Sequence, residues 1–177
     1  LDSVFVLAPL AQLEPNDPLA SSLTTCYASC PFSSLCSEME LFLRLTPAKT
    51  YAITGSDGKT TSTTLTGLFL TEECRRSGKG NTFVGGNIGT PLLTKCGEMT
   101  YDDNAVLELS SFQLMGIRNT PRYVAITNVS PNHLDWHKDM QEYFQAKNSL
   151  IKATKGKVFI GSSVQDFAKS QNITISE

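Results

Sequence analysis

The sequence predicts an α/β fold in which a mostly parallel β-sheet is covered by helices on both faces. From residue 49 onward, short apolar runs typical of buried strands alternate with stretches of helical pattern. Polar clusters follow three of these runs, at the carboxyl ends of strands, where sheets of this class bind their ligands. The alternation indicates the fold class, and the polar clusters indicate where function should be sought.

The regular part of the chain contains four predicted strands and three predicted helices. The strands are expected at residues 50–54, 105–109, 123–127 and 157–160, and the helices at residues 59–75, 139–154 and 164–170. Because helices separate the strands, successive strands are expected to run in the same direction.

The beginning of the chain is less regular. A strand is predicted at residues 4–7, and a segment rich in Pro, Ser and Thr at residues 8–37 reads as loop or weakly specified helix. Residues 38–45, EMELFLRL, have apolar side chains at helical spacing, and Pro47 ends that helix.

Composition narrows the possible classes of protein. The chain has 177 residues, of which 40% are hydrophobic, which is enough for one good core. A net charge of -2 gives no sign of a nucleic-acid or membrane surface, and no apolar run reaches the ~18 residues of a membrane-spanning helix. Without a basic and then apolar leader pattern, the expected compartment is the cytoplasm. Both ends of the chain cut into strand-like sequence, so we expect a fragment of a longer protein.

The five cysteines have no predicted function. They lie at positions 26, 30, 36, 74 and 96, with no C-x-x-C pair and no histidine nearby. This spacing favours buried or free thiols over a zinc site or a disulfide framework.

The first polar cluster is a glycine-containing loop in YAITGSDGKTT, residues 51–61. Gly55 and Gly58 allow backbone angles that side chains forbid, and the helix that follows directs free N–H groups at the loop. Lys59 would add a positive charge for phosphates, and the hydroxyl of Thr60 is placed to bind Mg²⁺. The gap between the glycines is shorter than in the usual P-loop. Judged alone, the segment fits an ordinary strand-to-helix turn equally well.

The second and third clusters strengthen the nucleotide interpretation. Glu108 ends the strand AVLEL, where a carboxylate would complete a metal site with Thr60, although strand-end carboxylates are more often merely solvated. His133 and His137 have the i,i+4 spacing of zinc-binding helices, but no Glu follows the first of them, so a phosphate or Mg²⁺ contact fits better. Composition alone predicts that Lys147 lies on a solvated helix face.

These residues together resemble the ATP-dependent Mur ligases. That family has a shortened phosphate loop, G-x-x-G-K-T/S, which is the spacing of GSDGKT. The stretches VGGNIGTPLL, VLELSSFQL and ITNVSPNHLDWHKDMQEYFQAK match in order and in approximate spacing. The match is close over residues 38–160, and ELSSFQL separates the D-glutamate-adding members from their sister ligases.

The resemblance implies a domain organisation. Residues 48–177 would form a truncated central ATP-binding domain of the P-loop type, and residues 1–47 would be the C-terminal part of a Rossmann-like domain that binds the UDP substrate. The resemblance also implies that these 177 residues do not include the C-terminal domain of the family. We therefore expect the chain alone to bind nucleotide without ligating.

The resemblance also implies roles for individual residues. Lys59 would hold the phosphates of ATP, Thr60 and Glu108 would bind a first Mg²⁺, and His133 would bind a second. Lys147 would be carbamylated by CO₂ and so become an anionic metal ligand. The catalytic set would be Lys59, Glu108, His133 and Lys147; the nucleotide would be held by Gly55, Ser56, Asp57, Gly58, Lys59, Thr60 and Thr61; and the nucleotide-sugar would be contacted by Asn87, Ser110, Gln113 and His133.

The implied reaction is the addition of D-glutamate to UDP-N-acetylmuramoyl-L-alanine through an acyl phosphate, in cytoplasmic peptidoglycan precursor synthesis. The implied partners are these small molecules, with no nucleic acid and no membrane, and the implied state is a monomer. Two differences from the family pattern are Ala8-Pro9-Leu10, in place of a Ser/Thr-Pro-Gly turn, and Asn132, where many members have Asp. The alternatives are another Mur or folylpolyglutamate-type ligase, and a non-catalytic nucleotide-binding module.

Overall fold

The fold is that of a computed structural model, which describes residues 5–7, 35–115, 117–130, 147–148, 150–151, 154 and 156–170. Its centre is a five-stranded sheet in the order β4-β5-β3-β6-β7, in which every pair of neighbours is parallel. The strands are β3 (Lys49–Thr54), β4 (Thr82–Gly86), β5 (Asn104–Glu108), β6 (Tyr123–Ile126) and β7 (Lys157–Ile160). The predicted α/β class is confirmed.

The strand order places a switch of direction beside β3. The chain moves from β3 to β4 and back to β5 on one side, and then crosses β3 to form β6 on the other side. Strand β3 therefore lies between β5 and β6, and the loops that follow these three strands meet at one edge. In open parallel sheets the crevice at such a switch point is where ligands bind.

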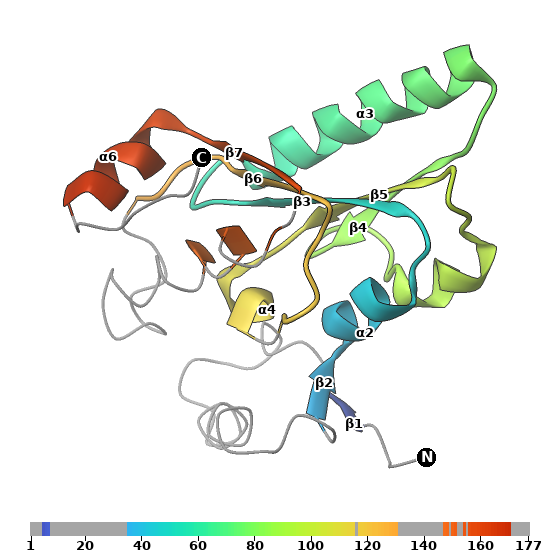
Figure 1. Cartoon of the computed structure of the whole chain (residues 1–177), viewed down its shortest axis with the longest axis horizontal. Helices are drawn as coiled ribbons and strands as arrows, with labels where there is room; N and C mark the ends of the chain where they lie inside the picture. The colour runs from blue at the N-terminus through green and yellow to red at the C-terminus, as the bar shows by residue number, and fades with distance from the viewer. Residues whose placement is uncertain are drawn as a thin grey trace.

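Helices lie on both faces of the sheet (Figure 1). One face carries α3 (Lys59–Ser77), while α2 (Glu38–Leu45), the 3₁₀ helix η2 (Leu93–Glu98) and α4 (Ser111–Met115) lie on the other. Helix α6 (Ser162–Ser170) follows β7. A separate parallel pair joins β1 (Phe5–Leu7) to β2 (Leu35–Ser37).

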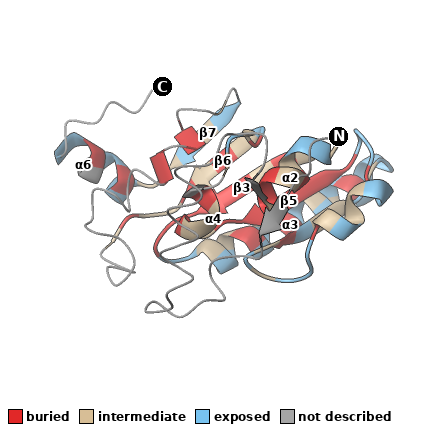
Figure 2. Cartoon of the chain, turned by 90° about the horizontal axis from the view of Figure 1, so that it is seen from below, coloured by how far each residue is buried: buried red, intermediate tan, exposed pale blue. Residues whose placement is uncertain are grey.

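The hydrophobic core lies between the sheet and the helices opposite α3. Phe42 of α2, Leu107 of β5 and Leu114 of α4 are buried in it, and β5 is buried along its whole length (Figure 2). Helix α2 belongs to this core, although the predicted domain boundary falls after residue 47. That boundary stays a prediction.

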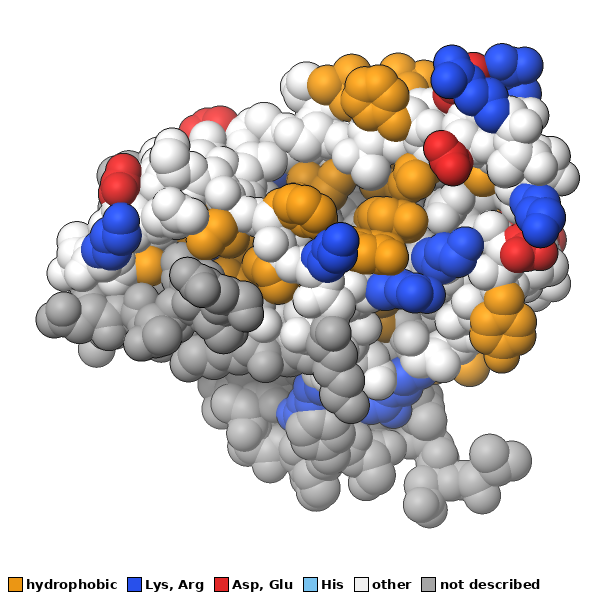
Figure 3. Space-filling view, turned by 45° about the horizontal axis from the view of Figure 1, so that its top comes forward, with side chains coloured by type: hydrophobic (Ala, Val, Ile, Leu, Met, Phe, Trp, Pro, Cys, Tyr) orange, Lys and Arg blue, Asp and Glu red, His pale blue; other side chains and the backbone are white. Residues whose placement is uncertain are grey.

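Helix α3 contacts the sheet through small residues. A Cβ atom added at Gly67 would lie 2.6 Å from Cγ2 of Val84 on β4, so the glycine permits this close approach. The outward face of α3 exposes Leu65, Leu68 and Phe69, which form the orange group over the helix in Figure 3. None of the helices that the structure describes is long and apolar enough to cross a membrane.

Two strands were not predicted. Strand β4 has the sequence TFVGG, whose paired glycines give a weak strand pattern, and its place comes from parallel pairing with β5. Strand β2 lies in the segment predicted as loop or weakly specified helix, and that prediction is wrong for residues 35–37. Helix α3 continues to Ser77, two residues beyond its predicted end. Of the predicted helix at 139–154, residues 147–148 and 150–151 are helical and residue 154 is not, while residues 139–146, 149 and 152–153 lie outside the described part.

Candidate functional site

The glycine-containing loop connects the end of β3 to the start of α3. Gly55 has φ of 151° and Gly58 has φ of 73°, so both adopt the positive φ values that favour glycine. Gly58 is the N-cap of α3 and has no side chain, so the first turn of the helix lacks a side-chain cap. The N–H groups of that turn are therefore available to an anion, as the sequence predicted.

Lys59 is folded back over its own loop. Its Nζ donates hydrogen bonds to the carbonyl oxygens of Gly55 and Ser56, each at 2.9 Å. These bonds hold the ammonium group above the loop rather than extended into solvent. Thr60 and Thr61 occupy the exposed first turn of α3. A positive charge, first-turn amides and a hydroxyl thus gather where phosphate would lie.

Glu108 ends β5 at the same edge of the sheet. It pairs in register with Ile53 of β3, two residues before Gly55, and only 2% of it is exposed. Its Oε1 accepts a hydrogen bond from Nδ2 of Asn87 at 3.0 Å. Within the described residues, its Oε2 is buried with no hydrogen-bond partner.

An ionised oxygen that is buried without a partner is costly unless a ligand satisfies it. A hard cation such as Mg²⁺ prefers carboxylate oxygens, so the chemistry of Glu108 fits the predicted metal. No group of three or more His, Cys, Asp or Glu side chains that could hold a metal occurs in the described part of the chain. His133 and His137 lie outside that part.

Lys147 is buried, with 1% exposed, so the prediction of a solvated position that composition alone gave is wrong. Burial, and then the positive charge of Lys59, lower the pKa of Lys147 to about 7. The two lysines therefore lie close enough to interact, and Lys147 belongs to the same region as the loop.

The three predicted substrate contacts that the structure describes all take part in hydrogen bonds within the protein. Asn87 is exposed and holds Glu108 through its side chain, and its backbone N–H donates to the carbonyl oxygen of Glu108 at 2.8 Å. Ser110 and Gln113 bond to each other: the N–H of Ser110 donates to Oε1 of Gln113 at 3.0 Å, and the N–H of Gln113 donates to Oγ of Ser110 at 3.3 Å. This is a capping box at the start of α4, so these two side chains already have a structural task.

Sequence reasoning missed the residues that follow β6. Asn128 and Ser130 bond to the loop from the neighbouring strand, with the Oδ1 atom of Asn128 accepting from the N–H groups of Ser56 and Asp57. The signal that was available is their position: they belong to the polar cluster at the carboxyl end of β6, and β6 pairs with β3.

The family model, the relatives and the solved structure that this chain resembles are all those of ligases. The model of the Mur ligase middle domain matches residues 53–174. The UDP-N-acetylmuramoylalanine--D-glutamate ligase of Clostridium kluyveri is 55% identical over 116 residues, which cover 66% of this chain and 24% of the relative. The ligase of the same name from Clostridium tetani is 56% identical over 117 residues, with the same coverage of 66% and 24%.

The chain spans about a quarter of the length of these curated relatives. Among solved structures, the UDP-N-acetylmuramate:L-alanyl-gamma-D-glutamyl-meso-diaminopimelate ligase from Neisseria meningitides aligns with a TM-score of 0.55 and 14% identity. That alignment covers 95% of this chain and 55% of the other. At this identity the likeness shows a shared fold.

Proposed function

Because this chain belongs to the Mur ligase family, we propose that it takes part in the ATP-dependent addition of D-glutamate to UDP-N-acetylmuramoyl-L-alanine. The two Clostridium relatives described above carry that activity in their names. The observation that carries the proposal is the buried Oε2 of Glu108, which has no hydrogen-bond partner among the described residues. It lies at the same edge of the sheet as the loop that presents Lys59 and the first-turn amides of α3. We place this reaction in cytoplasmic peptidoglycan precursor synthesis, in a monomeric protein.

The residues of the loop would bind and orient the phosphates of ATP. The amides of the first turn of α3 and the ammonium of Lys59 stabilise negative charge, so they favour a phosphate both before and during transfer. Thr60 and Glu108 would hold Mg²⁺. When bound, the ion would supply positive charge that offsets the negative charge of the phosphoryl group during its transfer. In the chemistry proposed, the substrate carboxylate attacks the γ-phosphorus and ADP leaves. The amine of D-glutamate then displaces phosphate from the acyl phosphate.

Lys147 is proposed to react with CO₂. Only the neutral amine is nucleophilic, and with a pKa of about 7 roughly half of Lys147 is neutral at neutral pH. The nitrogen forms a bond to the carbon of CO₂ and loses one proton, which leaves a carbamate with two oxygens. That group would replace a buried cation by an anionic metal ligand. His133 is proposed as a further metal ligand, and Asn87, Ser110 and Gln113 as contacts of the nucleotide-sugar.

Calorimetric titration of the chain with ATP, with and without Mg²⁺, tests the nucleotide site. Lys59→Ala should abolish measurable binding, because it removes the ammonium group that bonds to the carbonyl oxygens of the loop. Lys95→Ala is the matched control, since Lys95 pairs with Glu98 on η2. Wild-type chain that fails to bind ATP, or Lys59→Ala binding as tightly as wild type, would contradict the proposal.

A second experiment tests the reaction and the substrate. The 177-residue chain is expected to bind ATP and yet release no phosphate when UDP-N-acetylmuramoyl-L-alanine and D-glutamate are added. D-glutamate-dependent phosphate release by this chain alone would overturn that expectation. A longer protein containing this sequence should release phosphate only with both substrates. Activity with a folate substrate instead would favour a folylpolyglutamate-type ligase, and no turnover would favour a non-catalytic module.

A further inference from the structure

The loop between β3 and α3 is held in shape by residues 127–130, which follow β6 and which we call the clamp segment. Asn128 Oδ1 accepts hydrogen bonds from the N–H groups of Ser56 at 3.0 Å and of Asp57 at 2.8 Å. Ser56 Oγ donates to the carbonyl oxygen of Ser130 at 2.9 Å and accepts from the N–H of Ser130 at 2.9 Å. The contacts join residues more than 70 positions apart in the chain.

Thr127 adds a third point of attachment. Its hydroxyl donates to the carbonyl oxygen of Asp57 at 2.6 Å, and a Cβ atom placed on Gly55 would overlap that hydroxyl oxygen. Gly55 is therefore required for the space that Thr127 occupies as well as for its positive φ. The clamp segment thus contacts the loop along most of its length.

These contacts divide the amides of the loop into two groups. The N–H of Asp57 is directed at Oδ1 of Asn128, and the N–H of Ser56 is shared between that oxygen and the carbonyl oxygen of Asn128 at 3.1 Å. The first hydrogen bond of α3 is donated by the N–H of Ser62 to the carbonyl oxygen of Gly58. The amides of residues 58–61 therefore precede the first helical bond and have no acceptor within the helix.

We propose that Asn128 is a positioning residue of the phosphate loop. By binding the amides of Ser56 and Asp57, it fixes the turn so that the amides of residues 58–61, and not those of Ser56 and Asp57, bind the phosphates. Asn128 itself touches no nucleotide in this arrangement. The inference rests on the proposed function, because it takes ATP as the ligand of the loop.

The physical reason is pre-organisation. A loop whose amides are free to rotate loses conformational freedom when it closes on phosphate, and that loss weakens binding. The two hydrogen bonds that Oδ1 of Asn128 accepts, together with the contacts of the Ser56 and Thr127 hydroxyls, order the loop before the ligand arrives. Removal of the Asn128 side chain should therefore weaken ATP binding even though no phosphate contact is lost.

The test uses ATP without metal as the probe, so that Glu108 has no part in the result. In the ¹⁵N–¹H spectrum of the wild-type chain, ATP should shift the amide signals of residues 58–61 and leave those of Ser56 and Asp57 nearly unchanged. Asn128→Ala should raise the dissociation constant at least about tenfold, which corresponds to losing two neutral hydrogen bonds. In that variant the signal of Asp57 should respond to ATP as well, whereas the N–H of Ser56 keeps the carbonyl oxygen of residue 128 as an acceptor.

Asn119→Ala is the matched control. Its side-chain amide bonds to Glu40 at 2.8 Å, away from the loop, so it removes a buried contact of an Asn without touching the clamp segment. The control should lose stability and keep its affinity for ATP within about twofold. If Asn128→Ala does not fold, Thr127→Val and Thr127→Ser replace it: Val should weaken ATP binding, and Ser should restore it by returning the hydroxyl.

Each result bears on a different statement. Wild-type chain that binds no ATP would overturn the proposed function and this inference together. ATP binding by the wild type, with the same affinity in a folded Asn128→Ala or Thr127→Val variant, would overturn the inference alone. Strong shifts of the Ser56 and Asp57 amides in the wild type would also overturn it, because those N–H groups would then be ligands.

Discussion

The two ends of strand β5 each carry a buried carboxylate, and the two are satisfied very differently. Asp103 precedes the strand and Glu108 ends it, with 1% and 2% of each residue exposed. Asp103 accepts four hydrogen bonds, two from Asn81 and two from Thr100. Glu108 accepts one, from Asn87, and has an oxygen without a partner in the described residues.

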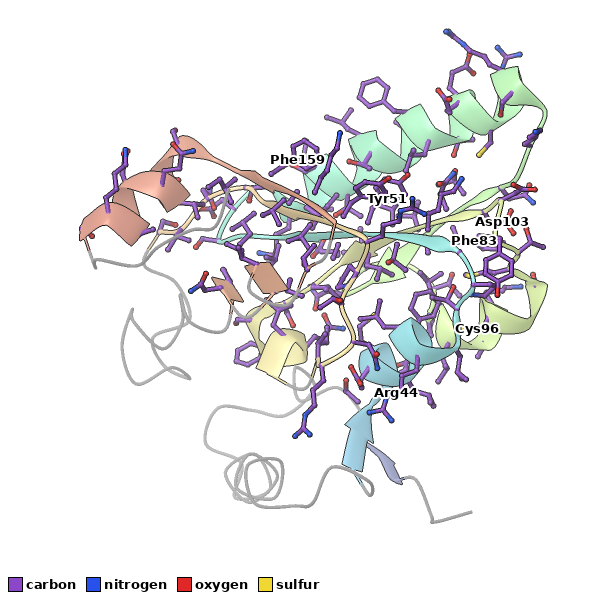
Figure 4. All side chains as sticks on the ribbon, in the orientation of Figure 1. Arg44, Tyr51, Phe83, Cys96, Asp103 and Phe159 are labelled. Carbon is purple, nitrogen blue, oxygen red and sulfur yellow. The ribbon has the colours of Figure 1, made fainter. Side chains whose placement is uncertain are left out.

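This difference separates a structural carboxylate from a candidate ligand. Asp103 lies at the end of the sheet opposite the phosphate loop, near Phe83 in Figure 4, and it ties the residues after α3 to the turn before β5. Burial by itself would raise the pKa of Asp103, but the bonds from Thr100 and Asn81 outweigh it and hold that pKa below its usual range. Glu108 is equally buried but accepts only one side-chain hydrogen bond, and its other oxygen has no partner in the described residues. Such an oxygen is expected where a bound ligand satisfies it.

The largest expected effect is at Asp103. Asp103→Ala leaves the N–H groups of Asn81 and Thr100 without their buried acceptor, and we expect a loss of about 3 kcal/mol in the free energy of unfolding. Urea denaturation followed by circular dichroism measures this. A loss below about 1 kcal/mol would show that the network is not structural.

Glu108→Gln should have the opposite profile. The change keeps the shape of the side chain and removes the charge, so the free energy of unfolding should stay within about 1 kcal/mol of wild type or rise. The Mg²⁺-dependent part of ATP affinity should fall at least about tenfold, which is ~1.4 kcal/mol. Calorimetry with and without Mg²⁺ gives both numbers. A large loss of stability with unchanged metal dependence would remove the distinction between the two ends of β5.

Lowering the pH should also destabilise the protein through Asp103, although by less than removal of its side chain does. Because the folded pKa of Asp103 is lowered, its contribution to stability is present above the unfolded value of 3.8 and is lost as the pH falls through the folded pKa. Unfolding free energies measured down through this range should decline in the wild type. The decline should be shallower in Asp103→Ala. Equal slopes in the two proteins would contradict the assignment of this acid sensitivity to Asp103.

Glu72 should show the smallest effect. Its carboxylate binds Arg75 and Arg76 at 2.7 Å on the exposed end of α3, where solvent screens the charges. Glu72→Gln should leave the urea midpoint unchanged within error. A measurable shift would mean that pairing rather than burial decides how much a carboxylate contributes here.

The parts of the fold that the sequence predicted are those encoded locally. The strands at β3, β5, β6 and β7 are short apolar runs, and the loop with Gly55 and Gly58 carries its geometry in its own residues. The capping box of Ser110 and Gln113 is also encoded locally, in the S-x-x-Q spacing of the two residues.

The remaining features depend on pairing between distant segments. Strand β4 is placed by β5, and Asn128 acts on residues 71 and 72 positions earlier in the chain. The burial of Lys147 was likewise invisible in composition, because it depends on what packs around the helix. Such contacts have no local pattern from which to be predicted.

Glu40 of α2 determines where this protein can be shortened. Its carboxylate accepts from the backbone N–H groups of Arg118 and Asn119 and from the side chain of Asn119, and Phe42 on the same helix is fully buried. A recombinant chain that starts at Lys49 would leave those amides without an acceptor and open a cavity under the sheet. A proteolytic or engineered boundary that preserves a folded sheet should therefore lie upstream of Glu38.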